Sequence, residues 1–181
     1  MSENPTRAGV GHPDLLAVYT NDHLASSTGG IELVSRMVRE HKGTRHEDNL
    51  RQLLGELREE KAALAATMAA LGFPVRQYKQ VAVWVAEKAS RIKLNGRLLS
   101  HSPLSSLVEF EFLASAVRGK RSGFETLRIA AAIDDRIDAE LFDGLIAQAN
   151  RQYVWLTEAR REVAAAVFGG DPDAIADLDE A

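Results

Sequence analysis

Apolar residues recur at every third or fourth position through five long stretches of this chain, which is the spacing of one face of an α-helix. The stretch between Thr44 and Gly72 shows the pattern most clearly. Its apolar line consists of Leu50, Leu53, Leu54, Leu57, Leu64, Met68 and Leu71. No segment alternates apolar and polar residues with the period of two that is typical of strands. The pattern therefore predicts an all-α fold.

Residues that favour helix starts and stops set the bounds of the five predicted helices. We expect these helices over about 13–42, 44–71, 75–95, 103–131 and 136–168. Pro13 suits a first turn, because the N–H that it lacks would be unpaired there. Thr44 and Glu47 predict a capping box, in which each side chain bonds the backbone N–H of the other residue. Gly72, followed by Pro74, is expected to end the second helix.

Glycines interrupt two of the predicted helices. Gly29 and Gly30 lie together inside the first helix, where each glycine costs roughly 1 kcal/mol relative to alanine. We expect a kink there or the close approach of a neighbouring helix. Gly119 and Gly123 are candidate breaks in the fourth helix.

Loop lengths predict how the helices are connected. The loops after the first and fourth helices are short, so each of these helices should form an antiparallel hairpin with the next one. The shorter helix over 75–95 then crosses over between the two hairpins. This predicts one bundle domain over residues 13–170. Residues 1–12 are expected to be a flexible tail, and residues 171–181 an acidic tail.

Composition excludes several classes of protein. The chain has no cysteine, which rules out disulfides, thiolate zinc sites and iron–sulfur clusters. It has neither a run of 18 apolar residues nor an apolar N-terminal segment, so we expect no transmembrane segment, no secretory signal and a cytoplasmic location. The net charge of −4 does not favour nucleic acid as a partner.

One segment resembles a known superfamily. The string LGELREEKAALAATMAALG is similar to the second helix of ferritin-like stress proteins, in which a glutamate and a histidine three residues later hold metal. The resemblance implies a ferritin-like bundle with ligands for two iron ions projecting inward from four helices. In this chain Ala63 stands three residues after Glu60. On the last helix, Gln148, Arg151 and Gln152 stand where carboxylate and histidine ligands are wanted, so the complete di-iron motif is absent.

Some polar residues nevertheless fall in or near the apolar stripes and are candidate ligands for iron or manganese. They are Asp22, His23, Glu60, Glu109 and Glu111. Each also has a structural interpretation. His23 can be a buried histidine bonded to a backbone carbonyl or a carboxylate, and Glu60 can lie on a solvated flank. Glu109 and Glu111 are about 200° apart on a helix, so one should face inward in an ion pair. Candidate partners for that pair are His23, Lys88 and Arg91.

Charge is distributed unevenly along the chain. Residues 76–121 contain nine Lys or Arg and three Asp or Glu, a local net charge of +6. This region is either a solvated surface or a contact for an acidic tail or partner, an anion site that uses Lys88, Arg91 and Lys93, or a surface that binds nucleic acid or a membrane. It has neither a glycine-rich phosphate loop nor alternating aromatic and basic residues, which disfavours nucleic acid.

The sequence as a whole favours a non-catalytic helical bundle that self-associates or binds a protein partner, with no cofactor expected. No serine lies in a G-x-S-x-G setting, so nucleophilic catalysis finds no support. Two alternatives stay open. One is a degenerate carboxylate site for iron or manganese, and the other is an anion-binding module on the basic segment.

Overall fold

A computed structural model describes residues 9–76 and 103–169, and within these ranges the chain forms four α-helices and no strand. They are α1 (Pro13–Glu40), α2 (Glu47–Ala70), α4 (Pro103–Ala130) and α5 (Ala139–Phe168). For these residues the prediction of an all-α fold is confirmed. The predicted crossover helix lies outside the described residues except for Val75 and Arg76, which are not helical. Most of the predicted N-terminal tail and the whole acidic tail also lie outside them.

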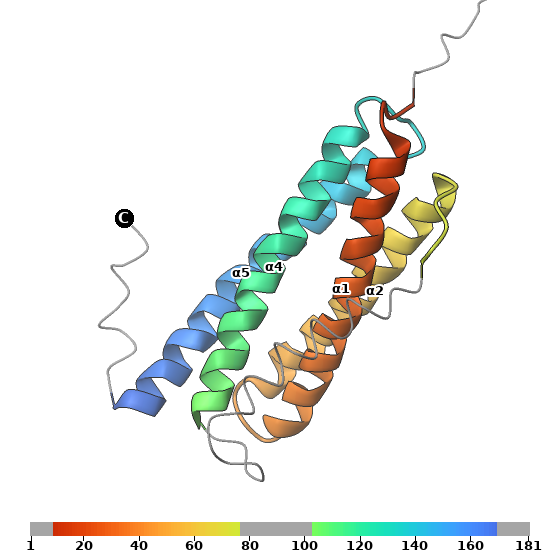
Figure 1. Cartoon of the computed structure of the whole chain (residues 1–181). Helices are drawn as coiled ribbons and strands as arrows, with labels where there is room; N and C mark the ends of the chain where they lie inside the picture. Colours follow the sequence, from red (N-terminus) through yellow and green to blue (C-terminus); the bar gives the residue numbers. More distant parts are fainter. Residues whose placement is uncertain (1–8, 77–102, 170–181) are drawn as a thin grey trace, which may run out of the picture.

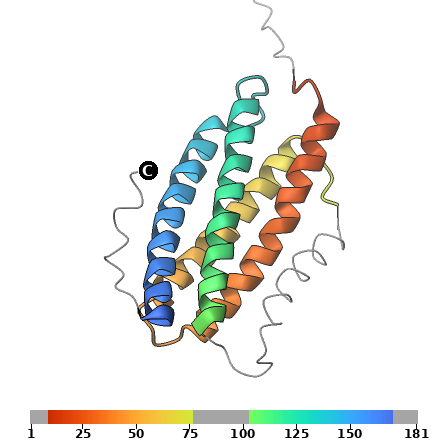
Figure 2. The ribbon, with the colours of Figure 1, turned by 60° about the vertical axis from the view of Figure 1, so that its left-hand side comes forward.

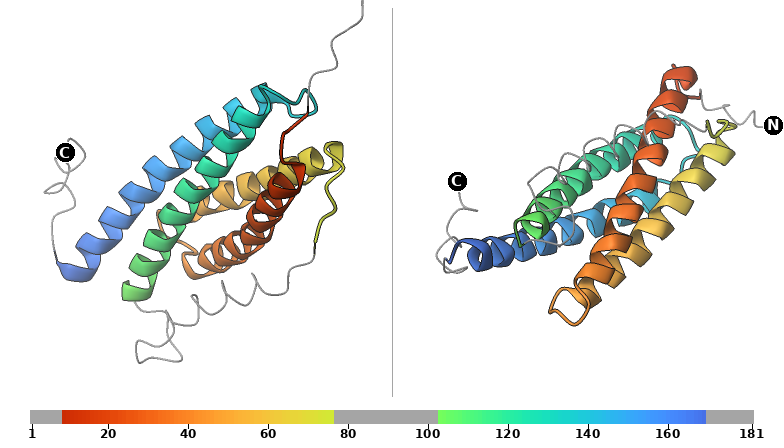
Figure 3. Two further views of the ribbon diagram at one scale, coloured as in Figure 1. Left: turned by 45° about the horizontal axis from the view of Figure 1, so that its top comes forward. Right: turned by 60° about the horizontal axis from the view of Figure 1, so that its bottom comes forward.

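The four helices form two antiparallel hairpins, α1 with α2 and α4 with α5 (Figure 1). The hairpins pack face to face, so that α1 and α4 share one side of the bundle and α2 and α5 share the other (Figure 2). Their axes cross at an angle, which the views of Figure 3 show best. As a result, α4 packs along α5 much more extensively than along α1.

The start of α2 differs from the prediction. The helix begins at Glu47, because the chain still turns through residues 41–46 and Gly43 adopts a φ of 77°. The capping box does not form. Glu47 accepts a hydrogen bond from the backbone N–H of Gly43 at 2.6 Å, and the Thr44 hydroxyl accepts one from that of His46 at 3.3 Å. The carboxylate thus bonds an N–H of the loop, one residue before Thr44.

The end of α2 follows the prediction. Gly72 has a φ of 74° and donates its N–H to the carbonyl of Ala69 at 3.0 Å. Phe73 donates to the carbonyl of Met68 at 2.9 Å. These two bonds make a Schellman motif, for which a glycine in the left-handed region is the preferred residue.

The glycines inside helices do not interrupt them. Helix α1 is continuous through Gly29 and Gly30, and α4 is continuous through Gly119 and Gly123. A Cβ added at Gly30 would meet no atom within 4 Å, so a close neighbour is not the reason for that glycine. Helix α5 begins three residues later than predicted, at Ala139. There the side chain of Asp138 accepts hydrogen bonds from the backbone of Glu140 and Leu141.

The core consists of two apolar clusters, one toward each end of the bundle. One cluster contains Phe110 together with Val34, Met37, Leu50, Leu53, Leu113, Val117 and Leu156. The other surrounds Phe142, with Leu16, Leu24, Leu64, Met68, Phe124, Leu127 and Leu145. Among the described residues, no helix is both long enough and apolar enough to cross a membrane.

Candidate functional site

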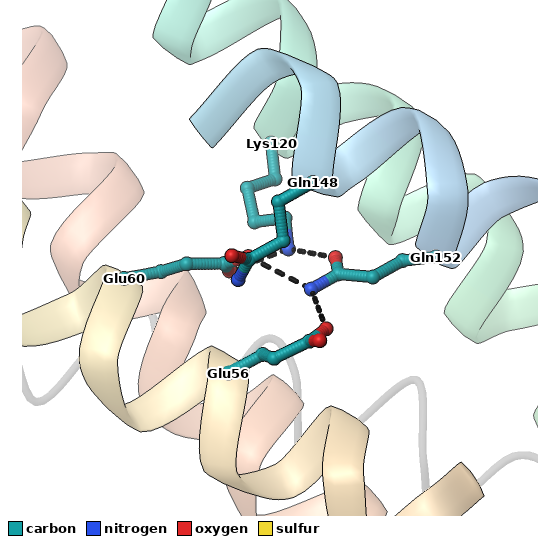
Figure 4. Close-up of polar contacts among 5 residues, drawn as sticks. All are labelled: Glu56, Glu60, Lys120, Gln148 and Gln152. Atoms are coloured by element: carbon teal, nitrogen blue, oxygen red, sulfur yellow. Dashed lines mark hydrogen bonds and ion pairs between the residues drawn. The ribbon is translucent and has the colours of Figure 1, made fainter. Parts of the chain in front are cut away.

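Five polar side chains from α2, α4 and α5 contact one another in the interior (Figure 4). Along their helices they lie between residues of the two apolar clusters. We call this set the polar layer. It consists of Glu56 and Glu60 on α2, Lys120 on α4, and Gln148 and Gln152 on α5. The helical spacing explains the arrangement, because residues four apart on α2 and on α5 project from the same face of their helix.

Glu60 is the centre of the polar layer and is only 3% exposed. The Nζ of Lys120 lies 2.5 Å from Glu60 Oε2, and Gln148 and Gln152 donate to Glu60 Oε1 at 3.0 and 2.9 Å. The carboxylate therefore accepts three hydrogen bonds from two helices. An ionised carboxylate needs such compensation when it is removed from water.

The rest of the polar layer is also bonded. Gln152 accepts a hydrogen bond from Lys120 at 2.5 Å and donates one to Glu56 at 2.7 Å. Burial lowers the pKa of Lys120, and the charge and hydrogen bond of Glu60 oppose that change. These contacts tie α2, α4 and α5 together by directional bonds, where apolar packing alone would fix the helices less specifically.

A cavity of about 360 Å³ lies beside the polar layer, between α1, α2 and α4. We call it the α1–α4 cavity. Its walls are mainly apolar and include Leu57, Leu64, Phe112, Leu113, Val117, Phe124 and Leu127. Glu60 and Lys120 of the polar layer also line it. Ser26, Ser115, Ala116 and Gly119 line it too and are exposed, so the cavity reaches the surface between α1 and α4.

Small residues on α4 let α1 approach closely at one point, and the cavity lies beside this contact. A Cβ added at Gly123 would lie 2.6 Å from His23 Cε1, so the His23 ring packs directly on the backbone of α4. The same ring makes an edge contact with Tyr19, at 4.6 Å between centroids. Burial lowers the pKa of His23, an effect that the charge of Asp22 opposes. Both the ordinary pKa of histidine and this lowering favour the neutral form of the ring at pH 7.

Lys61 supplies a second ammonium group to the cavity wall. Its Nζ donates a hydrogen bond to Thr28 Oγ1 at 2.8 Å, which joins α2 to α1. Within residues 9–76 and 103–169, Lys61 forms no ion pair with a carboxylate. The polar layer thus balances Lys120 with Glu60, whereas Lys61 is paired only with a hydroxyl.

The structure brings two of the five predicted metal ligands to one place. His23 and Glu60 both line the α1–α4 cavity. Asp22 is exposed on α1. In the part of the chain that the structure describes, no group of three or more His, Asp or Glu side chains is placed to hold a metal ion. Binding of iron or manganese stays a prediction without a described ligand set.

Glu109 and Glu111 point in different directions, as their spacing predicts. Glu109 is 3% exposed and lies 2.6 Å from Nη2 of Arg36, whereas the side chain of Glu111 is 49% exposed and 3.9 Å from Arg160. The inward residue is therefore Glu109. Its partner Arg36 was not among the predicted ones, of which Lys88 and Arg91 lie outside the described residues. The predicted anion site at Lys88, Arg91 and Lys93 lies outside them as well.

The polar layer is the feature that sequence reasoning missed. Gln148 and Gln152 were interpreted only as replacements for metal ligands, and Lys120 only as part of a basic segment. The apolar spacing could have indicated that Lys120 faces inward, because it lies three residues after Val117 and four before Phe124, both of them buried. A lysine on a buried stripe needs a buried acceptor.

Asn21 was missed in the same way. It is 2% exposed and donates to the carbonyls of Ala17 and Pro74, at 2.8 and 3.1 Å. It also accepts a hydrogen bond from the backbone N–H of Arg76 at 2.7 Å. This side chain holds the segment that follows α2 against α1.

Comparison of the chain with family models, with curated proteins and with solved structures gives no match in any of the three. The arguments about function therefore depend on the polar layer and the α1–α4 cavity themselves.

Proposed function

We propose that this protein is a non-catalytic binding protein with a ferritin-like bundle, and that the α1–α4 cavity is its ligand site. Two antiparallel hairpins packed face to face, with inward polar residues at mid-length, support the ferritin-like arrangement. In this proposal Lys120, Gln148 and Gln152 occupy the centre of the bundle, where metalloproteins of that plan carry carboxylates and histidines.

The cavity carries the proposal. Ligand sites in proteins are typically concave, mostly apolar and about 300–1,000 Å³ in volume, with a few polar groups that orient the ligand. The α1–α4 cavity has a volume of about 360 Å³, apolar walls on three helices, and His23, Glu60, Lys61 and Lys120 among its lining residues. At about 30 Å³ for each water-sized group, it holds about a dozen non-hydrogen atoms.

The ionisable groups of the cavity favour binding over catalysis. Glu60 and Lys120 bond each other and the glutamines of α5, so neither is poised to transfer a proton to a ligand. His23 lies against Tyr19 and Gly123, and no carboxylate orients its ring within the described residues. Among the described lining residues, the hydroxyls of Ser26, Ser27 and Ser115 bond backbone carbonyls, and that of Tyr19 bonds Thr126, so none is paired with a base.

A filled-cavity variant tests the proposal. Gly119 lines the cavity, and a Cβ there meets no atom within 4 Å, so a Gly119→Phe side chain has room to enter the space. We expect decan-1-ol, a neutral probe of about the right size, to bind the full chain by calorimetry and to shift the amide resonances of α1 and α4. Gly119→Phe should abolish both effects.

Gly144→Phe is the matched control. Gly144 is also an exposed helical glycine with open space around it, but it lies on α5, away from the cavity. Both substitutions replace a glycine within a helix, so their effects on helix propensity are similar. If decan-1-ol fails to bind, or binds equally well to the Gly119→Phe protein, the cavity is not a ligand site.

A specific observation also favours self-association, the second candidate function. Four large aliphatic side chains are exposed near one end of the bundle: Leu15 at 68%, Val18 at 41%, Ile129 at 74% and Ile133 at 49%. Leu15 and Val18 are on α1, Ile129 is on α4 and Ile133 is in the turn after α4. The hydrogen bond between Tyr19 and Thr126 at 3.2 Å joins α1 to α4 near these residues. We propose that a second copy of the chain covers this surface. A two-fold axis can place α1 of each copy against α4 of the other.

Light scattering tests this second candidate. The full chain should behave as a dimer, and Ile129→Glu should convert it to a monomer without changing its helical circular dichroism. Val154→Glu, at a residue that is 56% exposed on α5, is the control and should leave the dimer intact. A monomer at high protein concentration would exclude self-association through this surface.

A further inference from the structure

The charges on the wall of the α1–α4 cavity do not cancel, and this imbalance points to a class of ligand. The described residues of the wall include two ammonium groups, on Lys61 and Lys120, and one carboxylate, on Glu60. His23 adds no charge at neutral pH, because burial lowers its pKa. The described lining residues therefore carry one positive charge in excess, and Glu56, the second carboxylate of the polar layer, is not one of them.

The excess charge belongs to Lys61. The Glu60 carboxylate accepts hydrogen bonds from Lys120, Gln148 and Gln152, and Lys120 in turn donates to Glu60 and Gln152. Lys61 is half-buried and bonds the neutral hydroxyl of Thr28 at 2.8 Å. An ammonium group has three donors, so this hydroxyl leaves Lys61 with capacity to bind an anion.

We propose, on the basis of the ligand site proposed above, that the α1–α4 cavity binds a monocarboxylate with an unbranched or compact apolar body, and that Lys61 binds the carboxylate. The body of the ligand packs against Leu57, Leu64, Phe112 and Phe124. The single excess charge fits a monoanion, because a second negative charge would find no free cation among the described cavity residues. Apolar burial supplies affinity, and the charge-assisted hydrogen bond at Lys61 selects the head group.

Competing ligand classes fit the wall less well. A cationic ligand would need a carboxylate, and the only one on the described wall, Glu60, is already bonded by three donors. A neutral alcohol would fill the same apolar space but would gain only a neutral hydrogen bond at Lys61. Charge-assisted hydrogen bonds are about twice as strong as neutral ones, so the head group should matter.

The test compares three probes that share one apolar chain, namely decanoate, decan-1-ol and decylamine. Calorimetry on the full chain at low ionic strength should show decanoate binding about tenfold more tightly than decan-1-ol and decylamine most weakly. Lys61→Gln should reduce the ratio of decanoate to decan-1-ol affinity to near one. Lys42→Gln, which removes the same charge from an exposed residue of the α1–α2 loop, should leave that ratio unchanged.

The outcomes separate this inference from the proposed ligand site. Suppose that decan-1-ol binds and that Gly119→Phe abolishes its binding. If decanoate then binds no more tightly than decan-1-ol, or still binds more tightly in the Lys61→Gln protein, the carboxylate inference is wrong and the ligand site stands. If no probe binds, or Gly119→Phe changes nothing, both are wrong. Preference for decylamine would overturn the assignment of head-group charge. Added salt should weaken decanoate binding and leave decan-1-ol binding unchanged.

Discussion

The two sides of α4 meet their neighbours through different kinds of residue. Toward α2 and α5, Lys120 bonds Glu60 and Gln152 at 2.5 Å each. Toward α1, Gly123 lets the His23 ring pack on its backbone, and Gly119 borders the α1–α4 cavity. The first side is closed by directional bonds between long side chains. The second side is held by the His23 ring on Gly123, by the Tyr19–Thr126 hydrogen bond and by the Arg36–Glu109 ion pair, and it leaves space between these contacts.

This difference shows how a bundle can be specific and still hold a cavity. Polar groups that are fully bonded in the interior tolerate little displacement, because any shift leaves a buried charge without a partner. With α2, α4 and α5 held in that way, α1 need not pack along all of α4. The cavity then costs less than it would in a bundle held by apolar contacts alone, and the first predictions address that dependence.

Removal of Lys120 should give the largest effect. Lys120→Met leaves the buried Glu60 without a cation, and we expect a loss of about 3–5 kcal/mol in the free energy of unfolding. Urea denaturation measures the loss. Lys61→Met removes a lysine that forms no ion pair in the described structure, so it should cost about 1 kcal/mol or less. Equal losses in the two variants would show that the buried Lys120–Glu60 pair contributes no more stability than the Lys61–Thr28 hydrogen bond between α2 and α1.

The double variant Glu60→Leu with Lys120→Met sharpens this prediction. Replacement of both charged partners by apolar groups removes the buried charge altogether, so most of the stability should return. The coupling energy from the four proteins then measures the interaction of the pair. If the double variant is as unstable as Lys120→Met alone, the loss comes from packing and not from an unpaired carboxylate.

Gln152 should have the next largest effect, because it bridges three members of the polar layer. Its side chain bonds Glu56, Glu60 and Lys120, whereas Gln148 bonds Glu60 alone among the residues of that layer. Gln152→Leu should therefore cost about 1–3 kcal/mol in urea denaturation, and Gln148→Leu about 1 kcal/mol. If Gln148→Leu lost more stability than Gln152→Leu, Gln152 would not be the main bridging residue of the polar layer.

The helices followed from the sequence because their signals are local. The run of leucines from Leu50 to Leu71 gave α2 its buried face, and Gly72 ended that helix by its own backbone preference for positive φ. The start of α2 was misjudged because Thr44 and Glu47 matched a capping pattern while the chain was still turning at Gly43. A motif of two residues does not determine where a loop closes.

The polar layer could not be predicted in the same way, since it joins residues from three helices. Glu60 and Gln152 are 92 positions apart, and their meeting depends on how the two hairpins cross. Lys120 could have been assigned to the interior from its place on the stripe of Val117 and Phe124, but its acceptor could not. The cavity was also beyond prediction, because it depends on where α1 and α4 do not touch.

Two glycines on α4 differ in how closely α1 approaches them, and alanine substitutions test this difference. A methyl group at Gly123 would lie 2.6 Å from His23 Cε1, so Gly123→Ala must displace the ring and should cost about 1–2 kcal/mol. Gly119→Ala meets open space in the same helix and should stabilise the protein by up to about 1 kcal/mol. Thermal unfolding followed by circular dichroism measures both changes.

Removal of the clashing ring provides the check on Gly123. In a His23→Ala background the added methyl group has room, so Gly123→Ala should change from destabilising to neutral or stabilising. If Gly123→Ala is equally harmful with and without His23, the cost comes from the α4 backbone and α1 does not pack on it in solution.

The smallest expected effect is the pH dependence of the α1 side. Burial lowers the pKa of His23 from 6.5, with Asp22 opposing, so the folded protein favours the neutral ring. In the unfolded chain His23 binds a proton more readily than in the folded protein. The stabilising contribution of the neutral ring is therefore present above pH 6.5 and is lost as the pH falls below that value. The ring is only half-buried, so solvent screening keeps this loss small. Urea denaturation from pH 8 to pH 5 should show a shallower decline for His23→Gln than for His12→Gln, whose histidine is exposed just before α1. Identical slopes would mean that the ring is solvated and that α1 stands farther from Gly123 than the packing indicates.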